Sequence, residues 1–224
     1  MSKSTSLNFT QNINNSYVDF CSADVLQVIS VSPNNAGTTL TDGIRTFTAA
    51  GGTLVSGASA ASWSATVLGG RVIGMPVIVE KGQYTVTPTA AANAATVDSG
   101  TTNATFNLRV EYFKDLYVAA AEDAVVKTIS VTSFDTAARV MSLWIISSDE
   151  QPVLIGAVNI PANSGNNGTE PHVDLLGGTL MPALPYDANG KRVIALRAGQ
   201  KLAVSVPLVT AGTQINVTAQ VEEY

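Results

Sequence analysis

His172 is the first residue to consider for catalysis, because it is the only histidine among the 224 residues. No other side chain changes its charge near neutral pH unless its surroundings shift its pKa. A serine nucleophile would need His172 as its general base, but no G-x-S-x-G turn accompanies it. We therefore interpret His172 as a structural or solvent-facing residue and expect no catalytic residue.

Cys21 and the acidic residues offer no reactive group either. Cys21 is the only cysteine, so the chain has neither an intrachain disulfide framework nor a thiolate metal cluster. The pairs Asp149-Glu150 and Glu122-Asp123 are adjacent, and adjacent residues of a strand point to opposite faces. Residues 187–190 begin like a calcium loop, but the glycine comes too early and the closing glutamate is missing. The sequence therefore predicts no enzyme activity, no metal and no cofactor.

Aromatic side chains could provide a different chemistry, the stacking of sugar rings. Trp144 lies within an apolar stretch and is predicted to be buried. Trp63 follows a stretch of small residues and Tyr186 lies in a turn-rich stretch, so these two are the candidate exposed aromatics. Exposed, parallel rings there would favour a carbohydrate-binding or adhesin module.

The composition excludes several partners. Only 13% of the residues are charged, about half of the ~25% that is usual in soluble chains, while 46% are apolar. A net charge of -5 without a basic run gives no reason to expect nucleic acid or an anionic membrane as a partner. The polar N-terminus predicts neither a signal peptide nor a membrane anchor, so we expect synthesis in the cytoplasm.

Alternating apolar residues predict the strands that must carry any site. In residues 200–209 and 214–221 the apolar positions alternate with polar or small ones, which is typical of strands with one buried face. A break at residues 210–213 separates these two segments, so we expect them to be antiparallel partners. Further strands are predicted at residues 24–32, 65–68, 71–79, 84–87, 104–113, 125–132, 138–147, 153–160, 172–176 and 192–196.

The order of these strands indicates two related halves. Residues 25–32 (VLQVISVS) align without gaps on residues 125–132 (VVKTISVT), and both halves continue with a Gly-Gln turn and a closing strand. Two unrelated β modules or one continuous sheet system remain the alternatives. We expect an all-β fold, an antiparallel β-sandwich of jelly-roll or immunoglobulin-like type, with β domains at residues 21–115 and 120–224 and a hinge at 114–123.

The first twenty residues are expected to form an extended arm. Leu7, Phe9 and Ile13 are isolated apolar residues in a segment of Ser, Thr, Asn and Gln, which has too little apolar surface to fold alone. Either this arm is a frayed terminus, or it becomes ordered by lying along a neighbouring subunit. The three apolar side chains are then the candidate interface residues.

The second half carries a resemblance to a known group of proteins. ISVTSFDTAARVMSLWIIS is followed by a strand ending in Asn-Ile-Pro, by LRAGQKL and by the terminal INVTAQVEEY. Over residues 125–224 this order resembles β-sandwich modules of tailed-bacteriophage virion proteins.

The resemblance implies a structural role in a phage particle, as a tail, collar, fibre-base or capsid-decoration protein. The implied partners are further copies of the chain, in a trimer or higher ring, and other virion proteins such as capsid, portal or tail. The implied location is the virion, with no nucleic acid and no membrane bound. The resemblance supplies no catalytic residue.

Overall fold

The computed structural model describes residues 12–99, 102–120, 122–177 and 184–224, and within them all regular elements are strands. The strands are β1 Asn12–Cys21, β2 Leu26–Asn35, β3 Gly43–Thr48, β4 Thr53–Leu54, β5 Ser62–Leu68, β6 Arg71–Glu80, β7 Tyr84–Val86, β8 Thr96–Val97, β9 Thr105–Val118, β10 Ala124–Ser133, β11 Arg139–Ile146, β12 Pro152–Ile160, β13 Val173–Asp174, β14 Ile194–Leu196, β15 Lys201–Val206 and β16 Gln214–Glu223. The expected all-β fold is confirmed.

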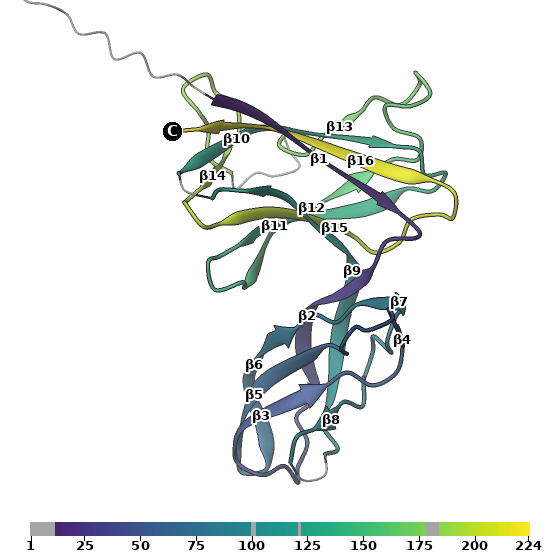
Figure 1. Ribbon diagram of the computed structural model, residues 1–224, viewed down its shortest axis with the longest axis vertical. Coiled ribbons are helices and arrows are strands. Elements are labelled where there is room, and N and C mark those ends of the chain that lie inside the picture. Colours follow the sequence, from purple (N-terminus) through teal and green to yellow (C-terminus); the bar gives the residue numbers. More distant parts are fainter. Residues whose placement is uncertain (1–11, 100–101, 121, 178–183) are drawn as a thin grey trace, which may run out of the picture.

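The strands form three antiparallel sheets, named here by their place in Figure 1. The upper sheet has the order β1-β16-β10-β13, with β14 also pairing with β10. The central sheet has the order β12-β11-β15-β9-β2-β7-β4, and the lower sheet has the order β6-β5-β3-β8. The upper and lower sheets pack against different parts of the central sheet, and most buried apolar residues of the three sheets form one large cluster. A second, small cluster lies on the central sheet and consists of Ile29, Phe113, Trp144, Ile146 and Ala203.

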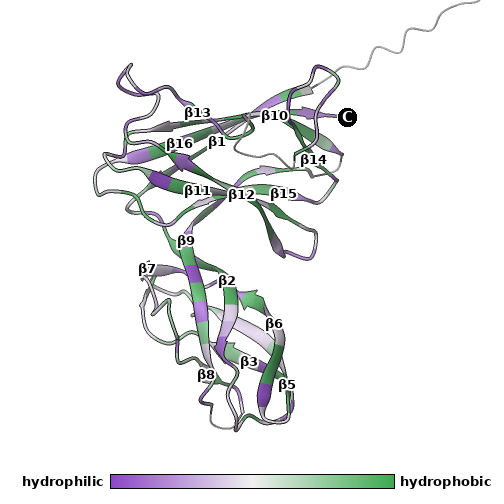
Figure 2. Ribbon diagram, turned by 180° about the vertical axis from the view of Figure 1, so that it is seen from behind, coloured by the Kyte–Doolittle hydropathy of each residue, from purple (hydrophilic) through white to green (hydrophobic). Residues whose placement is uncertain are grey.

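Strand β9 links the two halves of the molecule. Its first part pairs with β2 and its last part pairs with β15, so that it runs from the lower into the upper half (Figure 1). The hinge expected at residues 114–123 therefore begins inside a strand. Leu116 is buried and Lys114 lies opposite Val204 in the ladder, which is why the chain stays extended to Val118. Figure 2 shows alternating hydrophobic and hydrophilic residues along β9.

The expected pairing of residues 200–209 with 214–221 is wrong. Strand β15 lies in the central sheet between β11 and β9, whereas β16 lies in the upper sheet between β1 and β10. Nearly every side chain of β15 is buried, on both faces of the sheet, because β15 is an interior strand. The connection between the two strands therefore crosses from one sheet to the other instead of forming a hairpin.

The expected arm of residues 1–20 is a strand over its described part. Residues 12–21 form β1, which pairs with β16 along its whole length. Phe20 is buried and Val18 lies opposite Val217, so this segment has enough apolar surface to join the sheet. Leu7 and Phe9 lie outside the described residues, while Ile13 lies in β1 with its side chain exposed.

The two strand pairs behind the predicted repeat have similar geometry. Val31 of β2 lies opposite Leu108 of β9, and Val131 of β10 lies opposite Val217 of β16. Each pair contains a register shift near the start of its opening strand. The aligned segments 25–32 and 125–132 therefore include strands with matching partners, although one pair lies in the central sheet and the other in the upper sheet.

The expectation that Trp63 is exposed is wrong. Its side chain is 0% exposed and contacts the ring of Phe106, with 5.0 Å between the ring centroids. The ring of Phe47 also packs against Phe106, with 4.8 Å between the ring centroids. Trp63 occupies an inward position of β5, because Ala61, Trp63, Ala65 and Val67 alternate toward the core. The small residues before Trp63 suggested an exposed loop, but they lead directly into strand β5, in which Trp63 points to the core.

A buried carboxylate fixes the turn between β10 and β11. Asp135 is fully buried and forms an ion pair with Arg139 at 2.8 Å. It also accepts hydrogen bonds from the N–H of Ala137 and from the N–H and hydroxyl of Thr210. Burial by itself would raise the pKa of Asp135, but the hydrogen bonds from Arg139 and Thr210 outweigh it and lower that pKa well below its usual range. This carboxylate links the β10–β11 turn to the crossing after β15.

Candidate functional site

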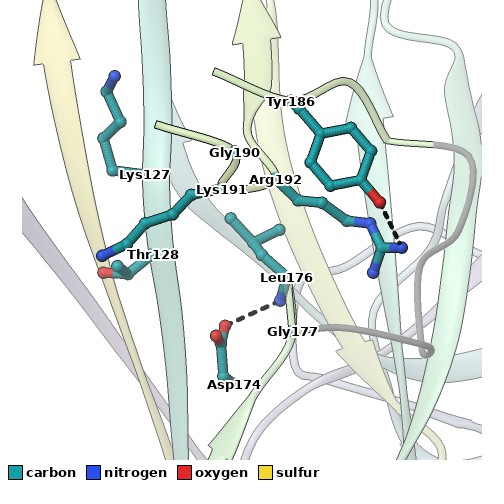
Figure 3. Close-up of a pocket in the computed structure, with 9 residues that line it drawn as sticks. All are labelled: Lys127, Thr128, Asp174, Leu176, Gly177, Tyr186, Gly190, Lys191 and Arg192. Carbon is teal, nitrogen blue, oxygen red and sulfur yellow. Dashed lines mark hydrogen bonds between the residues drawn. The ribbon is translucent and has the colours of Figure 1, made fainter. Parts of the chain in front are cut away.

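A hollow of about 320 Å³ opens beside the upper sheet, where β10 and β13 meet the turn before β14 (Figure 3). Strand β10 contributes Lys127 and Thr128, and β13 contributes Asp174. The turn contributes Tyr186, Gly190, Lys191 and Arg192. The hollow therefore combines an aromatic ring, three basic side chains and one carboxylate.

The turn that carries Tyr186 is fixed by local hydrogen bonds. The carboxylate of Asp187 accepts hydrogen bonds of 2.9 Å from the backbone N–H groups of Asn189 and Lys191. Gly190 has a φ of 75°, a backbone conformation that favours glycine. Tyr186 and Arg192 then face each other across an isolated antiparallel bridge. This geometry places both side chains at the mouth of the hollow (Figure 3).

Tyr186 and Arg192 form a pair. Tyr186 is 61% exposed, as expected from the sequence, and its hydroxyl accepts a hydrogen bond of 3.0 Å from Nη2 of Arg192. The guanidinium carbon lies 5.3 Å from the centre of the tyrosine ring. Nε and Nη1 of Arg192 are buried without an acceptor in the described part of the chain. The charge of Arg192 is therefore held by an aromatic ring and has no carboxylate partner among the described residues.

Lys127 differs from the other two basic residues because carboxylates compensate its charge. Its Nζ lies 3.1 Å from Glu222 and 3.9 Å from Asp187, and the hydrogen bond to Glu222 raises the pKa of Lys127. The backbone N–H of Lys191 lowers the pKa of Asp187. Lys191, like Arg192, forms no ion pair within the described residues, whereas Lys127 forms two.

A second, polar hollow of about 500 Å³ adjoins the first and shares Thr128 and Asp174 with it. It lies on the outer face of the upper sheet and is lined by Asn15, Thr128, Ser130, His172, Asp174, Thr218 and Gln220. Strand register explains this set, since Gln220 lies between Asn15 of β1 and Thr128 of β10. The neighbouring rung holds Tyr17, Thr218 and Ser130. We call the two adjoining hollows the upper groove.

The sequence candidates are distributed unevenly around the upper groove. Tyr186 and His172 line it, whereas Trp63 is in the lower core and Cys21 lies at the end of β1. Sequence reasoning missed Lys127, Asp174 and Arg192, which meet only because β10, β13 and the turn before β14 are neighbours. Among residues 12–99, 102–120, 122–177 and 184–224, no three His, Cys, Asp or Glu side chains are grouped as metal ligands.

A different surface covers the outside of the lower sheet. Ile44 of β3 and Ile73 of β6 both lie opposite Thr66 of β5, so the three side chains share one outward rung. Ile44 is 74% exposed, and the exposed apolar side chains of this region are Ile44, Leu68, Ile73, Met75, Val77 and Val79. We call them the lower apolar face.

The open edge of the lower sheet is poorly suited to the addition of another strand. Strand β6 is the edge strand, and its register with β5 shifts between Ser64 and Thr66. Pro76 has no N–H, and Gly74 has a φ of 75° in the irregular stretch. These features protect the edge, so a partner would have to cover the lower apolar face from its side.

No protein-family model matches the chain, and no curated protein matches its sequence. Within the described residues there is no helix that is long and apolar enough to cross a membrane.

Proposed function

We propose that this chain is a structural subunit of a bacteriophage virion, which associates with copies of itself and with other virion proteins. The observation that carries the proposal is the lower apolar face, a set of large apolar side chains exposed on the outer face of the lower sheet, which no other layer of the described residues covers. Contiguous apolar patches are uncommon on soluble monomers and mark interaction surfaces. The resemblance of residues 125–224 to phage β-sandwich modules is the reason for proposing virion proteins as the partners.

The chemistry of the lower apolar face favours a protein partner. Its central rungs contain Ile44, Ile73 and Val77 together with Thr46, Ser64 and Thr66, and none of these six residues is charged. Full burial of an exposed large apolar side chain contributes about 1.5 to 3 kcal/mol, and these partly exposed side chains would gain a fraction of that in an interface. A second sheet can pack face to face on such a surface at a distance of about 10 Å.

The role proposed here needs no catalysis. It places the protein in the virion after synthesis in the host cytoplasm, as a homo-oligomer such as a trimer or a higher ring. The low content of charged residues agrees with a subunit whose surface is largely covered by neighbours. Other virion proteins, such as capsid, portal or tail, are the further partners.

The double substitution Ile44→Lys/Ile73→Lys tests the lower apolar face. We expect the purified chain to lose its oligomeric state and to keep a cooperative melting curve, since both side chains point outward in the single chain but their charges would be buried without partners in the interface. Native mass spectrometry gives the mass, and circular dichroism gives the melting curve. Leu208→Lys, at an exposed apolar position far along the chain, is the control. An unchanged oligomer mass in the double variant would argue against this interface.

Deletion of residues 1–11 tests the terminal segment separately. All ten residues of β1 remain in this variant, so the sheets are expected to stay folded. We expect weaker self-association, because Leu7 and Phe9 are apolar and are predicted to contact a neighbouring subunit. Light scattering over a concentration series measures the effect. If the deletion variant dissociates at the same concentration as the parent, these residues make no contribution to assembly.

A further inference from the structure

We propose that the upper groove binds an acidic oligosaccharide, with Tyr186, Lys191 and Arg192 at the end that takes the carboxylate of a sugar. This goes beyond the structural role and uses a different surface. The two hollows have volumes of about 320 and 500 Å³ and share Thr128 and Asp174. Together they offer room for several sugar units along the outer face of the upper sheet.

One exposed aromatic ring lines the upper groove, and a second lies on a strand rung next to it. Tyr186 is 61% exposed in the basic hollow, and Tyr17 is 57% exposed on the rung beside Thr218. The hydroxyl of Tyr17 donates a hydrogen bond of 3.0 Å to Oδ1 of Asn216, and Arg192 donates to the hydroxyl of Tyr186. Both rings are therefore held in place while an apolar surface stays open for the C–H face of a sugar.

The polar side chains between the rings are available to a ligand. Within the described residues, no hydrogen bond occupies the side chains of Asn15, Ser130, Thr218 and Gln220, although all four line the groove. By contrast, the buried amide of Asn93 donates to two backbone carbonyls and accepts an N–H. Amides and hydroxyls that both donate and accept match the hydroxyl groups of a sugar.

The charges select an acidic sugar over a neutral one. Glu222 and Asp187 compensate Lys127, whereas Lys191 and Arg192 have no ion-pair partner in the described ranges. Arginine favours carboxylates because its planar group donates several hydrogen bonds at once. Asp174 accepts the N–H of Leu176 through Oδ1 and stands where the two hollows meet. Its other oxygen accepts no hydrogen bond from the described residues and can accept a sugar hydroxyl.

Calorimetry with the full chain tests the proposal with three probes: a galacturonic acid tetramer, the same tetramer after reduction of its carboxyl groups, and a neutral cellotetraose. We expect the acidic tetramer to bind and its reduced form to bind about tenfold more weakly, which is the loss expected for one charge-assisted hydrogen bond. Tyr186→Ala should weaken the binding of both the acidic and the reduced tetramer, because it removes the stacking surface, and should weaken that of the acidic tetramer more, because it also releases Arg192.

Variants of the basic residues distinguish a lost charge contact with the ligand from a loss of folding. Arg192→Met should lower the affinity for the acidic tetramer about tenfold and leave that for the reduced form unchanged. Lys191→Met is the second variant, because its exposed side chain is not needed for folding, and Arg197→Met is the control outside the groove. Absence of binding by the acidic tetramer, equal binding of the acidic and reduced forms, or parent-like affinity in both Arg192→Met and Lys191→Met would each overturn the proposal. The oligomer mass, measured on the same samples, reports separately on the structural role.

Discussion

Val217→Asp is expected to abolish the cooperative folding of the upper sheet. Val217 is 0% exposed in β16 and lies between Val18 of β1 and Val131 of β10, facing the central sheet. A carboxylate at this position would be buried without a cation or a hydrogen-bond donor, which costs several kcal/mol. Since a domain is stable by only about 5 to 15 kcal/mol, this substitution removes most of the stability. A thermal melt followed by circular dichroism measures the loss.

Thr218→Asp is the matched control, because Thr218 is the next residue of the same strand and points to solvent. It introduces the same charge with the same loss of strand propensity, so that only the burial differs. We expect its melting curve to stay close to that of the parent. A Val217→Asp protein that melts like the parent would show that the β16 register described above is incorrect.

Asp135→Ala is expected to cost about 3 to 5 kcal/mol, the range for removing one partner of a buried ion pair. The side chain of Arg139, only 15% exposed, would lose its carboxylate, and the N–H groups of Ala137 and Thr210 would lose their acceptor. The turn after β10 and the crossing after β15 would both loosen. Urea denaturation of the parent and the variant gives the difference in the free energy of unfolding. A difference below about 1 kcal/mol would contradict the buried pair.

The same carboxylate predicts how stability depends on pH. The pKa of Asp135 is lowered in the folded protein, so the unfolded chain takes up this proton first as the pH falls. The contribution of Asp135 is fully present above about pH 5 and decreases as the pH falls below the unfolded pKa of about 3.9 toward the folded value. Asp135→Asn cannot ionise, so its deficit relative to the parent should be smaller at pH 3 than at pH 7. Equal deficits at both pH values would exclude this explanation.

The sequence predicted most strands to within a few residues, because alternation marks a strand with one buried face. Residues 125–132, 153–160 and 71–79 correspond to β10, β12 and β6. Strand β1 was missed, because its polar outer face dominates the composition of the segment. The alternation of Val18 and Phe20 toward the core was its only signal.

The candidate site was predictable only in part. Tyr186 was expected to be exposed because turn residues surround it, and its side chain is exposed. Trp63 was placed wrongly, since small residues near a tryptophan indicate a loop and a tightly packed strand equally well. No sequence pattern marks Asp174 or Arg192 as a site residue. Each joins the site only because strand pairing places it in the same hollow as Thr128.

The sequence by itself determined the all-β class, the position of most strands and the scarcity of charge, because these depend on local alternation and composition. The tertiary structure decided which strands are neighbours. It separates β15 from β16 and extends β9 through both halves, and it gathers Tyr186, Arg192 and Lys127 around one hollow. Pairing between strands depends on which faces must be covered together, and that is a property of the whole chain rather than of any segment.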